Sequence, residues 1–161
     1  MMPARTRRGD RNTPMSYSGD SAMRPMPVWY HETYTEGISR SARFPRDRYR
    51  MLRERLNDLH GTGLICIESP EPVVRDTLLI AHEQDYVDRF LSGSLDTKEV
   101  RRIGLEPWTG AFLPRTMRII GGAVEALAHV TRFGGIAANM AGGTHHSHRS
   151  FGSGYCVFND L

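Results

Sequence analysis

Short apolar runs alternate with helical patterns along most of the chain, and this alternation limits the fold more than any other feature of the sequence. The runs "PVWY" (27–30), "LICI" (64–67) and "GGIAANM" (134–140) have the length and composition of strands. The unbroken run 64–67 is typical of a strand buried on both faces. A fourth run, "DTLLIAH" (76–82), is interpreted as another short strand.

Helical periods separate these runs. A helix is expected to begin at Pro45 and to be closed by Gly61, and four residues of it recur at helical spacing: Tyr49, Leu52, Leu56 and Leu59. A second helix is expected near residues 83–91. A longer helix begins near Pro114, with four residues on one apolar face: Met117, Ile120, Val124 and Leu127. Helices that alternate with apolar strands predict an α/β fold with a mainly parallel sheet and flanking helices.

Two adjacent glycines lie inside the longer helix. Gly121 and Gly122 should each cost about 1 kcal/mol relative to alanine at such positions. We therefore expect the helix backbone to pack closely on the sheet at this point.

Composition divides the 161 residues into a tail and a domain. Residues 1–26 hold five Arg and two Asp and little to bury, which predicts a disordered Arg/Pro/Ser-rich tail, whereas residues 27–161 carry 16 Lys and Arg against 16 Asp and Glu. A balanced domain without a clustered basic face argues against nucleic acid as a partner, and the lack of a long apolar run argues against a membrane span. Cys66 and Cys156 form no CxxC motif and no signal peptide precedes them, so a cytoplasmic location is expected.

The glycine-flanked loop 141–155, "AGGTHHSHRSFGSGY", is the candidate site. It leaves the carboxyl end of the predicted strand 134–140, where ligands bind in sheets of this class. Gly142 and Gly143 allow a sharp turn that aims His145 and His146 at one cavity, where two histidines can divide the work of acid and base.

Two other interpretations of these histidines stay open. They can be solvated loop residues, or they can be zinc ligands, although three histidines within four residues rarely give a tetrahedral site. An acid and base pair also needs a carboxylate on one ring nitrogen, and Asp160 is the nearest acid in the sequence.

The segment "AGGTHHSHRSFGSGYCVFND" resembles the active-site segment of the histone deacetylase family. The family pattern is Gly-Gly-x-His-His, eight residues to a glycine, then an aromatic residue, a cysteine and a later Asn-Asp. Here the eight-residue step runs from His146 to Gly154, and four residues follow in place: Tyr155, Cys156, Asn159 and Asp160. The segments "YHETYTEG", "FPRDRYRMLRERL", "AHEQDYVDRFLSG" and "RRIGLEPW" are similar to bacterial members related to the class IV enzymes, so that the resemblance covers residues 28–161.

The resemblance implies an arginase/deacetylase fold and zinc-dependent hydrolysis of N-acetyl-lysine or a small N-acetyl amide. In the family a zinc ion polarises the acyl carbonyl and its bound water attacks. His145 and His146 match the catalytic pair, of which the second is usually the general base. Gly154 and Tyr155 match residues that line the acyl-lysine tunnel.

The zinc ligands of the family lie downstream of the segments matched here. The resemblance therefore implies that residues 27–161 are the N-terminal part of a deacetylase domain, with a fold incomplete on its C-terminal side, no metal ligands and no activity on its own. The alternative function is a non-catalytic remnant, or half of a split protein, that acts by protein–protein binding. A downstream half or a second copy of the chain would then be the partner.

Overall fold

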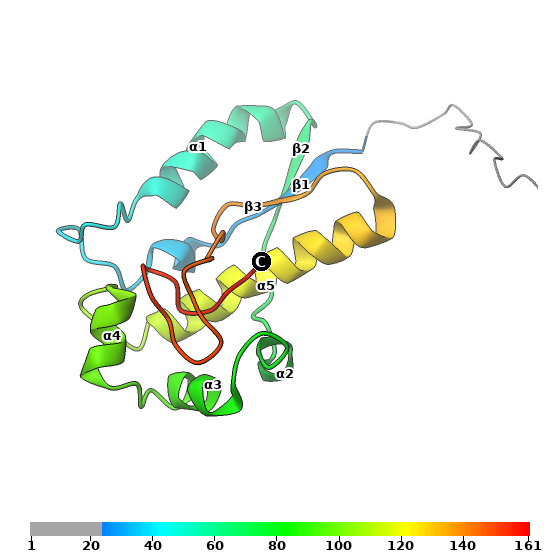
Figure 1. The fold of residues 1–161 in the computed structure, drawn as a ribbon. Coiled ribbons are helices and arrows are strands. Elements are labelled where there is room, and N and C mark those ends of the chain that lie inside the picture. The colour runs from blue at the N-terminus through cyan, green and yellow to red at the C-terminus, as the bar shows by residue number, and fades with distance from the viewer. Residues whose placement is uncertain (1–23) are drawn as a thin grey trace, which may run out of the picture.

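A parallel sheet lies at the centre of the structure, a computed structural model that describes residues 24–161. Its strands are β1 (Met26–Trp29), β2 (Ile65–Glu68) and β3 (Ala138–Asn139), in the order β2-β1-β3 (Figure 1). Val28 of β1 pairs with Ile67 on one side and with Ala138 on the other, and both pairings are parallel. The predicted α/β class and parallel sheet are confirmed.

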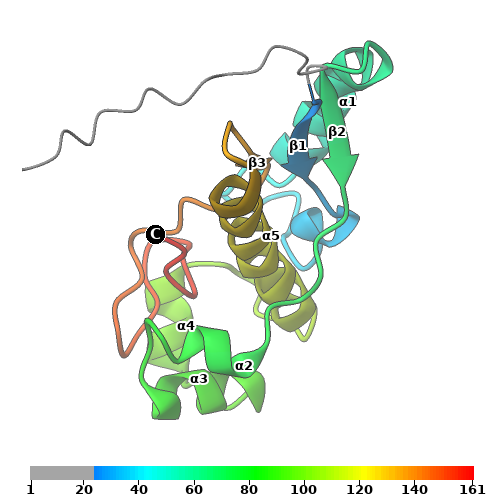
Figure 2. The same ribbon diagram turned by 90° about the vertical axis from the view of Figure 1, so that its right-hand side faces the viewer.

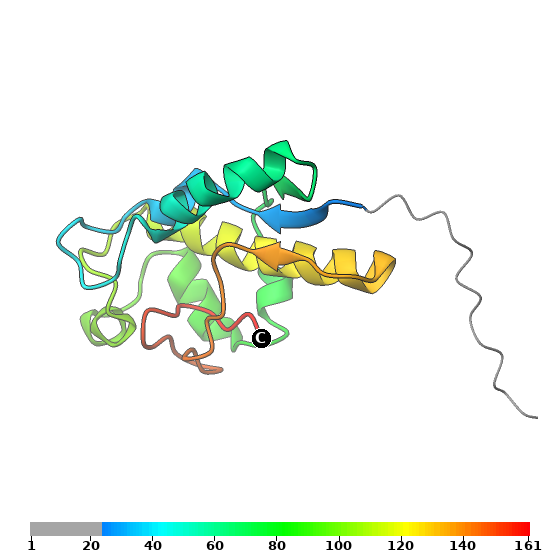
Figure 3. The same cartoon turned by 90° about the horizontal axis from the view of Figure 1, so that it is seen from above.

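One long helix covers each face of this sheet, α1 (Arg48–Gly61) on one side and α5 (Phe112–Phe133) on the other (Figures 2 and 3). On the first face the side chain of Leu56 packs against a small cluster around Val28 and Ile65. On the second face the ring of Trp29 meets His129 of α5 edge to face, at 6.2 Å between centroids. Burial of apolar side chains from both sides thus holds the sheet between the two helices.

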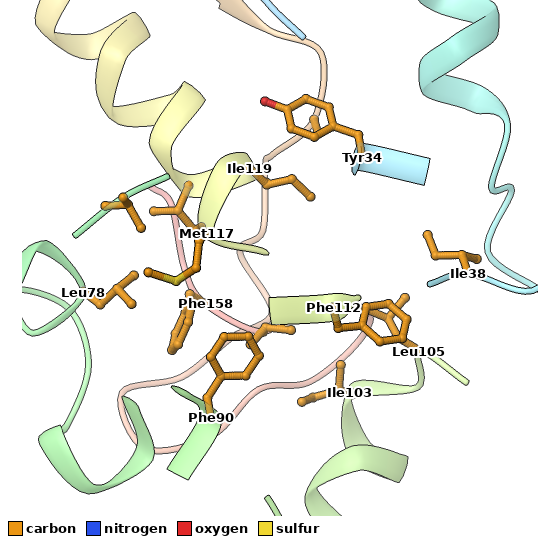
Figure 4. Packing of buried hydrophobic residues seen from close by; sticks show 14 of the residues in the cluster. Tyr34, Ile38, Leu78, Phe90, Ile103, Leu105, Phe112, Met117, Ile119 and Phe158 are labelled. Carbon is orange, nitrogen blue, oxygen red and sulfur yellow. The ribbon is translucent and has the colours of Figure 1, made fainter. Parts of the chain in front are cut away.

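The larger core lies where the N-terminal half of α5 meets three shorter helices and the C-terminal loop. The shorter helices are α2 (Arg75–Leu78), α3 (Gln84–Leu91) and α4 (Thr97–Ile103). Phe90 and Phe158 meet edge to face at 4.9 Å, close to Met117 (Figure 4), and Trp108 stacks on Phe112 at 5.0 Å. The core therefore joins α5 directly to the segment that follows the tandem histidines.

Besides α2, two helical elements were not predicted. They are the 3-10 helix η1 (Glu32–Thr35), capped by the side chain of His31, and α4. For α4 the sequence carried a signal, because Asp96 and Glu99 form a capping box in which each side chain accepts from the backbone of the other. Gly104 then ends the helix in the left-handed conformation, which is typical of a helix C-terminus.

Two strand interpretations were wrong. Residues 76–82 form most of α2 and a following turn. In this conformation the side chain of Leu78 is buried, whereas Ile80 is 81% exposed. The run 64–67 is not buried on both faces, because β2 is an outer strand of the described sheet and only Ile65 in it is buried.

The apolar face predicted for the long helix is correct only for its first half. Met117 and Ile120 are buried, whereas Val124 and Leu127 are exposed, since no described segment covers that part of α5. The helix begins at Phe112, and Pro114 lies in its first turn.

Close packing at the two helical glycines is confirmed, and it involves the segment after β2 and the last residue of β3. A Cβ on Gly121 would overlap the backbone carbonyl of Glu71, and one on Gly122 would lie 2.8 Å from the side chain of Asn139. The amide of Asn139 in turn donates to the carbonyl of Ile119 at 2.8 Å. The end of β3 is thereby fixed against α5.

The predicted tail, residues 1–26, lies outside the described residues except for its last three, and Met26 is already part of β1. Between residues 24 and 161 no helix has the length and apolar character needed to cross a membrane.

Candidate active site

The chain turns sharply as it leaves β3, and this turn presents the tandem histidines. Gly142 and Gly143 adopt φ values of 129° and 68°, which residues with side chains rarely take. The carboxylate of Asp160 accepts from the backbone N–H of Gly143 at 2.9 Å and of Thr144 at 2.6 Å. Asp160 therefore holds the turn from which His145 and His146 project.

The two imidazole rings lie next to each other, with centroids 4.1 Å apart and planes at 42°. His145 lies 2.8 Å from the carbonyl of Gly143 through Nδ1. A carbonyl oxygen only accepts, so Nδ1 of His145 is the donor in this contact. Both histidines line one cavity of about 260 Å³.

Gly154 and Tyr155 form the adjoining wall of the same cavity. A Cβ on Gly154 would lie 3.0 Å from the ring of His146, so the missing side chain is what lets the backbone approach that ring. Tyr155 has φ of 67°, held by a backbone hydrogen bond to Ile103 at 2.7 Å. Its ring contacts Phe44 edge to face at 5.4 Å. The four residues matched from the sequence are thus brought together, and their catalytic and substrate-binding roles remain predictions.

The segment behind the histidines is tied to the body of the protein by buried polar groups. His82 is buried, and its Nε2 accepts from the backbone N–H of Asn159 at 2.9 Å. Burial lowers the pKa of His82, so the neutral ring is favoured. The hydroxyls of Tyr86 and Ser147 both donate to the carbonyl of Val157, each at 2.7 Å. His82 therefore has a structural role.

The described residues supply no carboxylate to either imidazole ring. Asp160, the nearest acid in the sequence, bonds to backbone N–H groups and not to a histidine. In residues 24–161 no three His, Cys, Asp or Glu side chains are grouped so that they can hold a metal ion. The donor set of the described chain thus does not fit the zinc ion that the resemblance implies.

Two further residues that line the cavity could not be predicted from the sequence. Arg115 and Thr116, both in α5, are buried and line the cavity that also holds the histidines. Neither residue is among those of the apolar face predicted for this helix, so the sequence pattern carried no signal for them. Their position in the cavity depends on tertiary packing, which local patterns do not reveal.

Comparison with known proteins gives a family match over most of the chain. The family described as histone deacetylase domain matches residues 42–161. An uncharacterized protein of Picosynechococcus sp. is 39% identical over 138 residues, which are 84% of this chain and 44% of the relative. The acetoin utilization protein AcuC of Staphylococcus aureus is 29% identical over 108 residues, which are 58% of this chain and 28% of that protein.

The chain spans less than half the length of these curated relatives. The match to the family agrees with the parallel sheet and its flanking helices, and the fold is of the arginase/deacetylase class.

Proposed function

Because the chain belongs to the histone deacetylase family, we propose that it serves the hydrolysis of an N-acyl amide, with N-acetyl-lysine or a small N-acetyl amide as the substrate class. The observation that carries this proposal is the pair of adjacent imidazoles on the wall of a cavity, beside Gly154 and Tyr155. Histidine exchanges protons near neutral pH, which amide hydrolysis requires.

The two histidines have separate tasks in this proposal. His146 takes the proton from the attacking water, the water oxygen bonds to the acyl carbon, and the C–N bond breaks. His145 stabilises the developing charge, and His146 passes the proton that it took from water to the leaving nitrogen, which becomes the amine. Gly154 and Tyr155 hold the chain that carries the amide. Neither histidine is given the task of holding zinc, because the described residues hold no donor set for this ion. The tasks of the two histidines are therefore proton transfer and charge stabilisation.

The test measures acetate released from N-acetyl-lysine amide. The 161-residue chain is assayed alone, and also mixed with the part of the Picosynechococcus protein that lies outside the match, with and without added zinc. We expect His146→Ala to lower the rate about 10²- to 10⁴-fold, the usual contribution of a general base. His148→Ala is the matched control, because His148 stacks on Phe151 and does not line the cavity. No release in either preparation, or equal rates in the two variants, would contradict the proposal.

Binding of a protein partner is a second candidate function, and one observation favours it. In the described sheet β3 is an outer strand, and nearby apolar side chains are exposed: Leu127 by 68% and Ile136 by 73%. A strand edge beside exposed apolar side chains invites another strand to pair with it. Release of acetate only after mixing would show that such a partner is needed, whereas binding without release would favour a non-catalytic role.

A further inference from the structure

The cavity beside the tandem histidines also has a cationic wall. Besides the histidines, it is lined by Arg115 and Thr116 in the first turns of α5 and by Arg48 at the start of α1. A group bound at the histidines would therefore share a cavity of about 260 Å³ with two arginine side chains.

Arg115 is buried without an anionic partner in the described part of the chain. Only 4% of it is exposed, and its guanidinium lies 5.8 Å from the ring centres of Phe44 and of Phe112. Its Nε donates to the carbonyl of Tyr34 at 2.9 Å. Between residues 24 and 161 no carboxylate forms an ion pair with Arg115 or with Arg48. Burying a charge without a counter-charge is costly, so an anion at this position would stabilise the protein.

Two hydroxyl groups of the same cavity also lack partners. Thr116 Oγ1 and Thr144 Oγ1 are buried and make no hydrogen bond to any described residue. Thr116 is 4% exposed, and both threonines line the cavity. A buried hydroxyl left without a partner costs free energy, and each of these can donate to a carboxylate oxygen. The cavity thus combines a buried cation with unused donors.

We propose that this cavity recognises a carboxylate at the end of the acyl chain, so that the preferred substrates are N-acyl amides of the succinyl or glutaryl type. Arg115 pairs with the terminal carboxylate, and Thr116 donates to it. An acetyl group carries no charge and would leave Arg115 unpaired. An acyl chain whose amide lies at His145 and His146 extends through the same cavity toward Arg115. This inference rests on the proposed function, since it names the acyl group on which that function acts.

The experiment measures binding, so that it does not depend on turnover. The affinities of the 161-residue chain for N-succinyl-lysine amide and N-acetyl-lysine amide are compared by titration calorimetry. We expect the succinyl compound to bind about tenfold more tightly, the ratio that one charge-assisted hydrogen bond supplies. Arg115→Met should abolish this preference, while Arg55→Met, a change of an exposed arginine on α1, should preserve it.

Thr116→Val keeps the shape of the side chain and removes only the hydroxyl, so it covers the case in which Arg115→Met does not fold. It should weaken binding of the succinyl compound several-fold and leave the acetyl compound unaffected. Equal affinities in the wild type, binding of neither compound, or a preference that survives both substitutions would overturn the inference. Displacement of the succinyl compound by free acetate as readily as by free succinate would also overturn the inference. The cavity would then bind any small carboxylate and would not recognise the end of an acyl chain. A clear preference without acetate release would contradict only the proposed function.

Discussion

At the scale of single residues, the close contact between Gly154 and His146 constrains the candidate site. The position of a Cβ on Gly154 would lie 3.0 to 3.2 Å from three atoms of the histidine. The backbone of Gly154 has φ of 53°, in the left-handed region. This glycine therefore sets where the imidazole of His146 can lie, both through space and through its backbone conformation.

Gly154→Ala should displace the ring of His146 and lower the free energy of unfolding by about 1–2 kcal/mol, the usual cost of the left-handed conformation for a residue with a side chain. The displacement is measured from the NMR signals of the His146 ring, and the stability from urea unfolding. Gly110→Ala is the control, because no atom lies within 4 Å of the added Cβ. Equal behaviour of the two variants would show that the contact does not fix the ring.

The residues of the cavity differ in how far the sequence could predict them. His145 and His146 stand in a glycine-flanked motif, so their proximity and position after a strand could be predicted from the chain alone. Arg115 and Thr116 could not, because they meet the loop only through packing of α5 against residues 142–158. Motifs record chemistry that is local in the sequence, whereas the walls of a cavity come together only in the folded chain.

At the scale of elements, α5 organises the molecule because it contacts both the sheet and the site. Its glycine pair lets the helix approach Glu71 and Asn139, and its first turns form one wall of the cavity. A shift of α5 away from β3 would therefore change the distance between Arg115 and the histidines.

Gly121→Ala should test this close approach. The added methyl group would overlap the carbonyl of Glu71, so we expect a loss of about 1–3 kcal/mol in the free energy of unfolding, as in other overpacked sites. Gly61→Ala, at the last residue of α1, meets no atom within 4 Å and should be neutral or stabilising by up to about 1 kcal/mol. Urea unfolding of both variants gives the comparison, and an equal loss in both would argue against a tight contact at Gly121.

The elements themselves were predictable where local pattern and tertiary contacts agree. The strand at 27–30 and the helix near 83–91 were found within one residue at each end, because their apolar side chains are in fact buried. The strand predicted at 76–82 failed because an apolar run shorter than two helical turns has no distinct period. Most of the run 134–140 is outside β3, since only Ala138 and Asn139 meet a partner strand.

At the scale of the whole molecule, His82 joins the region between α2 and α3 to the end of the described chain. Its ring accepts from the N–H of Asn159, and Glu83 beside it donates through its backbone N–H to the carbonyl of Arg149. Burial lowers the pKa of His82 from its ordinary value of 6.5, with a smaller contribution from the charge of Arg149. The folded protein therefore resists protonation that the unfolded chain accepts.

Stability should consequently fall as the pH drops from about 7 to about 5, because His82 then binds more protons in the unfolded state than in the folded state. The slope from this residue is at most about 1.4 kcal/mol per pH unit. His82→Gln should make this slope shallower. His31 accounts for part of the slope that remains, because burial lowers its pKa as well. Urea unfolding at several pH values measures the slope, and an unchanged slope in the variant would assign the effect to other groups.

The pairing of β1 with both of its neighbours has a consequence for the order in which the molecule folds. Met26 meets Ile65 across a short stretch of chain, whereas Val28 meets Ala138 only after nearly all of the described residues have been made. Closing the longer loop costs about 1 kcal/mol more in chain entropy, so the β1–β2 unit with α1 forms first and β3 docks late. The tandem histidines follow β3 directly, so we expect them to find their places late among the described residues.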